Sequence, residues 1–270
     1  MDIMPDIMQT EENALERALR LAANEPAHRP DFYTALLSAS VFVFAPLSQV
    51  IEGPRALVQG ENITITHWSK KDGTRIIPFF SSLIALQRAA EGEYRYLALP
   101  ARVLFKMTKG HALLFNPKSP YGKEFSAREI ASLLSNGVNC LPQERVTKKA
   151  AETFLSQPEE YPSKMVDSLT TLMAKRGDVK SAYLLQLHEP SNDPKPHLVV
   201  GIELEGNVQQ LMLEIGVVAG DSIPPGKPLD LMRIIPGEKG LSEYFLKEVQ
   251  PFYERRWGAK LQDTLGFGRA

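Results

Sequence analysis

The sequence has a single cysteine, Cys140, among its 270 residues. One cysteine cannot form a disulfide within the chain. The first ten residues also lack the basic start and the continuous apolar stretch of a secretory signal. These absences predict a cytoplasmic protein. Cys140 has neither a second cysteine nor a local histidine motif beside it, so we interpret it as an incidental thiol rather than a nucleophile.

An excess of charge of one sign and a long apolar run are also missing. Lysine and arginine total 31 against 32 for aspartate and glutamate, which gives a formal net charge of −1. The field of the whole protein is therefore too weak to attract nucleic acid. The apolar run at residues 40–45 is far shorter than the roughly 20 residues of a membrane-spanning helix. We expect neither a nucleic-acid partner nor a membrane partner.

Motifs for cofactor binding are weak. Residues 220–227 superficially resemble a phosphate-binding loop, but the spacing is wrong and Pro228 stands where serine or threonine is needed. Residues 237–240 precede an expected helix, whose free amides could attract an anion. A tight turn between strand and helix is the commoner explanation. The sequence therefore predicts no cofactor.

Candidate metal and catalytic residues are equally sparse. His188 and His197 flank a proline-rich loop that contains Asp193, which makes a three-ligand metal site conceivable. Surface histidines at strand ends are commoner, so we predict no metal site. Asp167 and Ser168 share an expected helix without a partner histidine, so they form no recognisable triad. We assign no catalytic residue.

The length and the apolar content of 43% are sufficient for two hydrophobic cores. Periodicity weakens between them, and we place the first domain at residues 11–138, a connection at 139–157 and the second domain at 158–270. Hairpin signals occur in both halves. The fold class we predict is α+β, in two domains, each with a mainly antiparallel or mixed sheet packed with helices.

The patterns of the first half predict alternating helices and strands. We expect helices at 11–23, 30–38 and 101–107, strands at 41–44, 96–99 and 112–115, and a hairpin over 63–79 that turns at Asp72-Gly73. Ser81 or Ser82 should cap another helix, and Ser126 with Glu129 forms a capping box. Pro78 should lie at a sheet edge, a bulge or a strand end. Of His67 and Trp68, one should be partly buried.

The second half predicts helices at 163–175, 208–218 and 241–249. Antiparallel strands are expected at 182–187 and 198–204, and a further strand at 229–235. The best candidate for a functional surface follows at residues 251–258. Its aromatic and arginine side chains are of the types that dominate protein-interface hot spots. They are Phe252, Tyr253, Arg255, Arg256 and Trp257.

If that segment is helical, Tyr253 pairs with Trp257, and Phe252 with Arg256, at four-residue spacing. The alternative is that the aromatic rings dock the end of the chain onto its own domain, with Glu254 in an ion pair with an arginine. The residue pattern leaves both roles open.

Five stretches together resemble a known bacterial family. They are NEPAHRP at 24–30, DGT at 72–74 with IPFF at 77–80, GKEF at 122–125 with REI at 128–130, MVDSLTTL at 165–172 and PFYERRWG at 251–258. The chain is similar in these stretches to the SseB, or enhanced serine sensitivity, family. The resemblance implies an N-terminal and a C-terminal SseB domain. The family name records a serine-sensitivity phenotype and implies no catalytic residues.

We therefore expect a non-catalytic cytoplasmic protein that binds and regulates a protein partner, with a metabolic enzyme as one choice of partner. One alternative is an enzyme whose active site has no recognisable motif. Another is a toxin-neutralising or other protein-binding module. A deep cleft with clustered ionisable groups favours an enzyme, whereas a flat surface rich in aromatic and arginine side chains favours protein binding.

Overall fold

The computed structural model describes residues 12–46, 64–139, 154–190, 196–206 and 208–255. The chain forms two compact units, residues 1–140 and 141–270, which are described separately below. Cys140 and most of the segment that we predicted as the connection lie outside the described residues. No helix in the described ranges is long and apolar enough to cross a membrane.

The first unit contains a mixed sheet with the strand order β4-β1-β3-β5-β6, and β2 also pairs with β3. Strands β3 and β5 are parallel neighbours, whereas the other pairs are antiparallel. The strands are β1 (Ser40–Ala45), β2 (Trp68–Ser69), β3 (Arg75–Phe80), β4 (Arg95–Pro100), β5 (Ala112–Phe115) and β6 (Lys123–Phe125).

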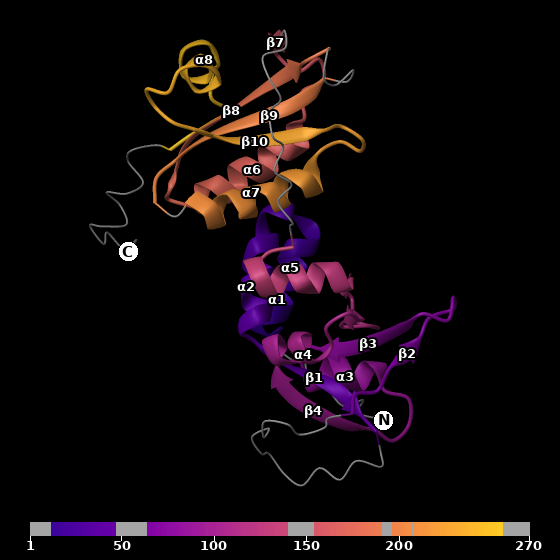
Figure 1. The fold of residues 1–270 in the computed structure, drawn as a ribbon. Helices are drawn as coiled ribbons and strands as arrows, with labels where there is room; N and C mark the ends of the chain where they lie inside the picture. Colours follow the sequence, from indigo (N-terminus) through magenta and orange to yellow (C-terminus); the bar gives the residue numbers. More distant parts are fainter. Residues whose placement is uncertain (1–11, 47–63, 140–153, 191–195, 207, 256–270) are drawn as a thin grey trace, which may run out of the picture. The chain divides into compact units, whose positions relative to one another are not determined.

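Helices cover both faces of this sheet (Figure 1). They are α1 (Ala14–Asn24), α2 (Arg29–Ser38), α3 (Leu83–Ala89), α4 (Ala101–Met107) and α5 (Ala127–Asn136), with a short 3₁₀ turn at Pro26–His28. Phenylalanine rings fill the core on one face, where Phe79 stacks on Phe115 with 4.7 Å between ring centroids. On the other face, Phe44 and Phe80 pack against α3.

Local signals in the sequence explain where these helices begin. Ser82 accepts a hydrogen bond from Ala85 N at the start of α3, and Ser126 and Glu129 form the predicted capping box of α5. Trp68 is the half-buried member of the pair with His67, because its ring stacks on Phe44.

Pro78 lies inside β3, although we expected it at an edge, a bulge or a strand end. Two strands pair with the same side of β3 in the described part of the chain. Strand β2 pairs with Arg75 and Ile76, and β1 pairs with Phe79 and Phe80. Pro78 falls between these two pairings. A residue without an N–H is tolerated there because the ladder on that side is interrupted.

The second unit contains a sheet with the strand order β10-β9-β8-β11, and β7 also pairs with β8. Strand β9 is antiparallel to β8 and parallel to β10, so this sheet is mixed as well. The strands are β7 (Phe154–Ser156), β8 (Val179–His188), β9 (His197–Leu204), β10 (Leu229–Ile234) and β11 (Tyr253–Glu254).

Two helices, α6 (Ser163–Ala174) and α7 (Val208–Ser222), lie on one face of this sheet, and α8 (Leu241–Glu248) lies on the other (Figure 1). The predicted apolar stripe of α6 is completely buried, as Met165 and Leu169 illustrate. Phe245 of α8 packs with Tyr183 and Leu185 of β8. Both units therefore confirm the predicted α+β class with a mixed sheet packed by helices.

Candidate functional site

The predicted interaction segment at the C-terminal end is an edge strand over its described part. Strand β11 pairs with β8 in antiparallel orientation. Phe252 N donates to Ala182 O over 2.9 Å, and Arg255 N donates to Lys180 O over 2.8 Å. The helical pairing that we considered is therefore wrong for these residues, because β8 supplies their main-chain partners.

The side chains of this segment are also tied to the second unit. Tyr253 Oη donates to Met173 O over 3.2 Å. The Arg255 guanidinium donates to Gly177 O and lies 3.0 Å from Glu205 Oε2. Burial raises the pKa of Tyr253, and the nearby Arg255 charge opposes that shift. These contacts are those expected of a segment that docks onto its own domain.

Arg256 and Trp257 lie outside the described residues. Glu254, which the docking alternative placed in an ion pair with an arginine, is exposed at the sheet edge, and Arg255 pairs with Glu205. The interface role of Phe252, Tyr253, Arg255, Arg256 and Trp257 stays a prediction.

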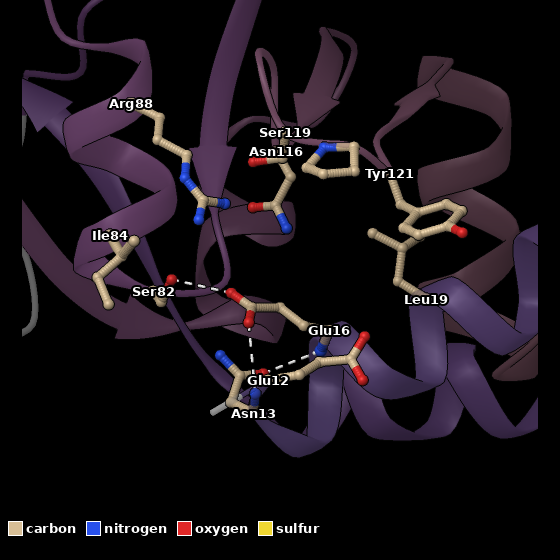
Figure 2. Close-up of a pocket in the computed structure, with 11 residues that line it drawn as sticks. Glu12, Asn13, Glu16, Leu19, Ser82, Ile84, Arg88, Asn116, Ser119 and Tyr121 are labelled. Atoms are coloured by element: carbon tan, nitrogen blue, oxygen red, sulfur yellow. Dashed lines mark hydrogen bonds between the residues drawn. The ribbon is translucent and has the colours of Figure 1, made fainter. Parts of the chain in front are cut away.

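A pocket of about 340 Å³ lies in the first unit, and its lining includes residues from α1, α3 and the loop after β5 (Figure 2). It is built where the parallel strands β3 and β5 end, because Ser81 directly follows β3 and Asn116 directly follows β5. The carboxyl ends of parallel strands are the usual place for ligand sites in sheets with helices on both faces.

A buried polar network lies beneath this pocket. Asn116 Oδ1 accepts from Ser81 N over 2.8 Å, and Asn116 Nδ2 donates to Ser81 Oγ over 2.8 Å. Ser81 Oγ donates to Glu16 Oε1 over 2.6 Å. Since Ser81 and Asn116 are only 8% and 2% exposed, these bonds satisfy groups that would otherwise be buried without partners.

The first turn of α1 holds Glu16 in this network. Asn13 Oδ1 accepts from Glu16 N over 2.9 Å, and Asn13 N donates to Glu16 Oε2 over 3.3 Å, which is a capping box. Ser82 Oγ donates to Glu16 Oε1 over 2.9 Å (Figure 2). The Glu16 carboxylate thus receives three hydrogen bonds and lies at a helix N-terminus, where negative charge is favoured.

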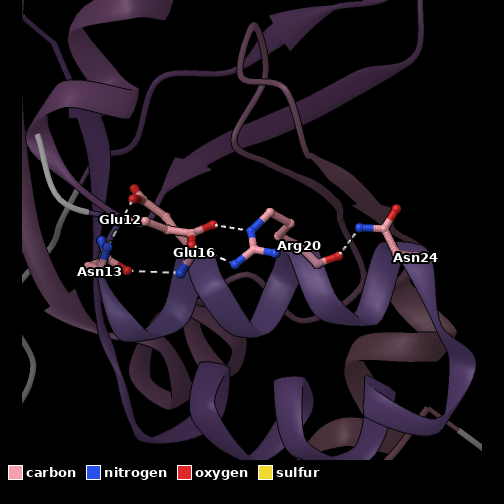
Figure 3. A network of polar contacts seen from close by, with 5 residues as sticks. All are labelled: Glu12, Asn13, Glu16, Arg20 and Asn24. Atoms are coloured by element: carbon pink, nitrogen blue, oxygen red, sulfur yellow. Dashed lines mark hydrogen bonds and ion pairs between the residues drawn. The ribbon is translucent and has the colours of Figure 1, made fainter. Parts of the chain in front are cut away.

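The second carboxylate of the pocket, that of Glu12, forms an ion pair with Arg20 (Figure 3). Arg20 Nε and Nη2 donate to the two oxygens over 2.9 Å and 3.0 Å in a fork geometry. The hydrogen bond from Arg20 lowers the pKa of Glu12, and that from Glu12 raises the pKa of Arg20. The negative charge of Glu12 is therefore balanced by the positive charge of Arg20.

Arg88 and Ser119 have no such partner among the residues that the structure describes. Arg88 of α3 is exposed, and the described part of the chain offers it no hydrogen bond or ion pair. Its guanidinium extends toward Asn116 (Figure 2). Ser119 Oγ is buried and likewise lacks a hydrogen-bond partner within the described ranges.

The loop that carries Ser119 has an unusual backbone. Asn116 and Lys118 have positive φ values of 49° and 63°, a conformation that non-glycine residues adopt rarely. At Gly122 a Cβ atom would lie 2.9 Å from Phe115 O, so only glycine fits the return of this loop. The side chain of Lys118 is held by Glu91 at 2.7 Å.

An aromatic cluster lies at the β4 side of the same unit. We call Phe42, Phe44, Trp68, Tyr94 and Tyr96 the aromatic edge. The Trp68 and Tyr94 rings contact Phe44 with centroid distances of 6.2 and 6.1 Å, and Tyr96 contacts Phe42 at 6.0 Å. Tyr94 and Tyr96 are 37% and 41% exposed. Large rings thus face solvent beside β4, the terminal strand of the part of this sheet that the structure describes.

Comparison with known proteins identifies both halves of the chain. Residues 15–132 match the SseB protein N-terminal domain, and residues 148–255 match the SseB protein C-terminal domain. The chain belongs to the SseB family. It is 40% identical to Protein SseB of Escherichia coli (strain K12) over 256 residues, which cover 95% of this chain and 97% of that protein. Protein SseB of Shigella flexneri shows the same identity and coverage. No solved structure matches the chain.

The limits of the SseB domains bear on the candidate surfaces. The aromatic edge and most of the pocket lining lie within the N-terminal SseB domain. The match to the C-terminal SseB domain ends at Arg255, so it includes β11 and excludes Arg256 and Trp257. Of the stretch at 251–258, residues 251–255 thus lie within the matched domain and include the edge strand β11, whereas residues 256–258 lie beyond that domain.

The histidines that we weighed as metal ligands lie on adjacent strands, His188 at the end of β8 and His197 at the start of β9. His197 is 7% exposed and therefore not the surface histidine that we expected, and its Nε2 lies 2.9 Å from Asp230 Oδ2. His188 pairs with Phe154 of β7 in the sheet, and Asp193 lies outside the described residues. Within the described ranges, no group of three or more His, Cys, Asp or Glu side chains could hold a metal ion.

Sequence reasoning missed both the pocket and the aromatic edge. The pocket brings three distant residues together, since Ser81 is 65 positions from Glu16 and 35 positions from Asn116. Its detectable local signals were the Asn13–Glu16 capping pattern and the polar residues directly after two apolar strands. The aromatic edge had a signal in the spacing of Tyr94 and Tyr96, which places both on one face of a strand, but only the sheet order shows that β4 is terminal among the described strands.

Proposed function

We propose that this SseB-family protein is a non-catalytic cytoplasmic protein that binds and regulates another protein. The observation that supports the proposal is the aromatic edge. Tyrosine and tryptophan anchor many protein interfaces because they bury a large area at a low cost in conformational entropy. A metabolic enzyme is the partner class that agrees with the family's serine-sensitivity name.

The surroundings of the aromatic edge favour a protein partner. Phe44, Trp68 and Tyr94 line an open hollow of about 670 Å³, with the carboxylates of Glu91 and Glu93 also in its lining. Apolar anchors surrounded by polar groups are the usual anatomy of a protein interface. Among the described strands, β4 lies beside them at the end of the strand order, which is where a further strand can add.

The pocket supports a binding role better than a catalytic one. A general acid or base must be able to exchange a proton with a substrate. The carboxylate of Glu16 is engaged by Asn13 and by two serine hydroxyls, and Glu12 is engaged by Arg20. The acidic groups of this pocket therefore serve helix capping and ion pairing.

The proposal is tested by affinity capture with the full chain from a bacterial cytoplasmic extract. Replacing both Tyr94 and Tyr96 by alanine should lower the recovery of a specific partner by about tenfold or more, because each removes an exposed anchor. Tyr244→Ala is a matched control, since Tyr244 is also 37% exposed but belongs to α8 of the other unit. Melting temperatures of all variants establish that they fold.

Equal recovery by the double variant and by Tyr244→Ala would contradict the role of the aromatic edge. The C-terminal residues Phe252, Tyr253, Arg255, Arg256 and Trp257 are a second proposed surface, and their variants belong in the same capture experiment. If no variant of either surface changes recovery, the protein-binding proposal fails.

A further inference from the structure

We infer that the pocket beside Asn116 is a binding site for a small organic carboxylate, with the carboxylate at Arg88 and an apolar body between α1 and the 116–122 loop. This site does not depend on the protein-binding role. Three features of the pocket support a carboxylate ligand: its charges, its hydrogen-bond donors without partners, and its volume (Figure 2).

The charge balance leaves one cation without a counter-charge. Glu12 is neutralised by Arg20, and Glu16 lies at the positive end of α1 with three hydrogen bonds to its carboxylate. Arg88 has no ion pair or hydrogen bond among the residues that the structure describes. A planar guanidinium in that state matches the two oxygens of a carboxylate.

Two further hydrogen-bond donors lie in the pocket with Arg88. Asn116 Nδ2 has two N–H groups, and only one donates to Ser81 Oγ. The Ser119 hydroxyl is buried in the pocket wall without a partner in the described chain. A buried hydroxyl of this kind is unfavourable until an acceptor reaches it. These donors can bond to the oxygen atoms of a ligand.

The other walls of the pocket are apolar, so they favour a ligand whose second part is apolar. Leu19, Ile84, Pro120 and the Tyr121 ring line the pocket together with the polar groups. The volume of about 340 Å³ lies at the lower end of the range for small-molecule sites. Inorganic phosphate would leave these walls uncovered, whereas a monocarboxylate with a short apolar chain would cover them.

The test is a titration of the ¹⁵N-labelled full chain with sodium butyrate and with sodium benzoate, followed through the backbone amide signals. We expect millimolar binding of at least one of the two, with shifts concentrated at Ser82, Arg88, Asn116 and Ser119. The neutral amide butyramide should cause no such shifts. Arg88→Gln should weaken binding by about tenfold or more, since it removes a charge-assisted hydrogen-bonded pair.

Arg102→Gln is the matched control, because Arg102 is an exposed arginine on α4 that does not line the pocket. Arg102→Gln should bind the carboxylates as tightly as the unchanged chain does. Both variants should have the melting temperature of the unchanged chain. The inference is overturned by the absence of localised shifts with both carboxylates, by equal binding of butyramide, or by undiminished binding to Arg88→Gln. Sodium phosphate that binds at these amides more tightly than either carboxylate would also overturn it.

Discussion

Asn116 and Ser81 join the carboxyl ends of β5 and β3 through two hydrogen bonds of 2.8 Å, one in each direction between the residues. These bonds fix the 116–122 loop to the start of α3 and so determine the floor of the pocket. The asparagine amide provides an acceptor for Ser81 N and a donor for Ser81 Oγ. A carboxylate of similar size would provide only acceptors at neutral pH.

Asn116→Ala should therefore lower the free energy of unfolding of the first unit by about 1 to 3 kcal/mol, because Ser81 N loses its acceptor while buried. The positive φ of 49° adds to this effect, since alanine disfavours that conformation. Urea denaturation measures it through Trp68 fluorescence in a Trp257→Phe background. Asn24→Ala is the control, because Asn24 donates to Arg20 O at an exposed position (Figure 3). Equal effects of the two substitutions would contradict the structural role of Asn116.

Local sequence patterns predicted much of the fold because the elements concerned carry their own signals. The capping box at Ser126 and the turn at Asp72-Gly73 both involve residues within a few positions of each other. Gly73, with a φ of 82°, adopts a conformation that glycine favours. Such features are determined by the local chain and can be recognised without tertiary information.

The candidate sites were harder to predict because they depend on sheet order. The contact of Ser81 with Asn116 exists only because β3 and β5 are parallel neighbours. The four-residue spacing of Tyr253 and Trp257 fits a helix, but the free edge of β8 pairs with residues 253–254. In the same way, the parallel pairing of β10 with β9 brings Asp230 to 2.9 Å from the buried His197. Spacing along the chain contains none of this information.

Glu129 predicts how the first unit responds to acid. Burial acts to raise its pKa, but hydrogen bonds from Ser126 and Lys123 outweigh burial, so the pKa of Glu129 lies below its ordinary value of 4.5. A carboxyl with a lowered folded-state pKa contributes stability above the unfolded-state pKa, and this stability is lost as the pH falls through the folded-state pKa. Glu129→Gln should therefore destabilise at neutral pH and have a smaller effect below about pH 4.

This pH dependence is measured by urea denaturation of Glu129→Gln and of the unchanged chain at about pH 7 and about pH 3. Glu93→Gln serves as the control, since Glu93 is exposed and lies in a loop away from α5. It should change stability little at either pH. A Glu129→Gln effect that is the same at both pH values would show that the ionised carboxylate is not the stabilising form.

Two glycines of the second unit should respond in opposite ways to alanine. A Cβ at Gly201 of β9 would lie 2.8 Å from Ile234 Cδ1 and 3.0 Å from the Phe245 ring. Gly201→Ala should lower the free energy of unfolding by about 1 to 3 kcal/mol through overpacking. At Gly220 of α7 nothing lies within 4 Å of the new Cβ, so Gly220→Ala should stabilise the helix by about 0.5 to 1 kcal/mol. Thermal melting of both variants checks the signs, and a neutral or stabilising Gly201→Ala would show that α8 packs less closely on β9.

The last prediction separates docking from interface roles at the C-terminal segment. The Arg255 side chain is 18% exposed and bonds to Gly177 O and Glu205. Arg255→Ala should therefore lower the free energy of unfolding by about 1.5 to 3 kcal/mol, the range for hydrogen bonds to charged groups. The effect of Arg255→Ala on partner capture should then follow the loss of folded protein.

Arg256→Ala is the comparison, because Arg256 lies beyond β11 and is proposed to contact a partner directly. That substitution should lower partner recovery while the melting temperature is unchanged. If Arg256→Ala leaves recovery unchanged, or if its loss of recovery only follows unfolding, the segment acts solely to close its own domain.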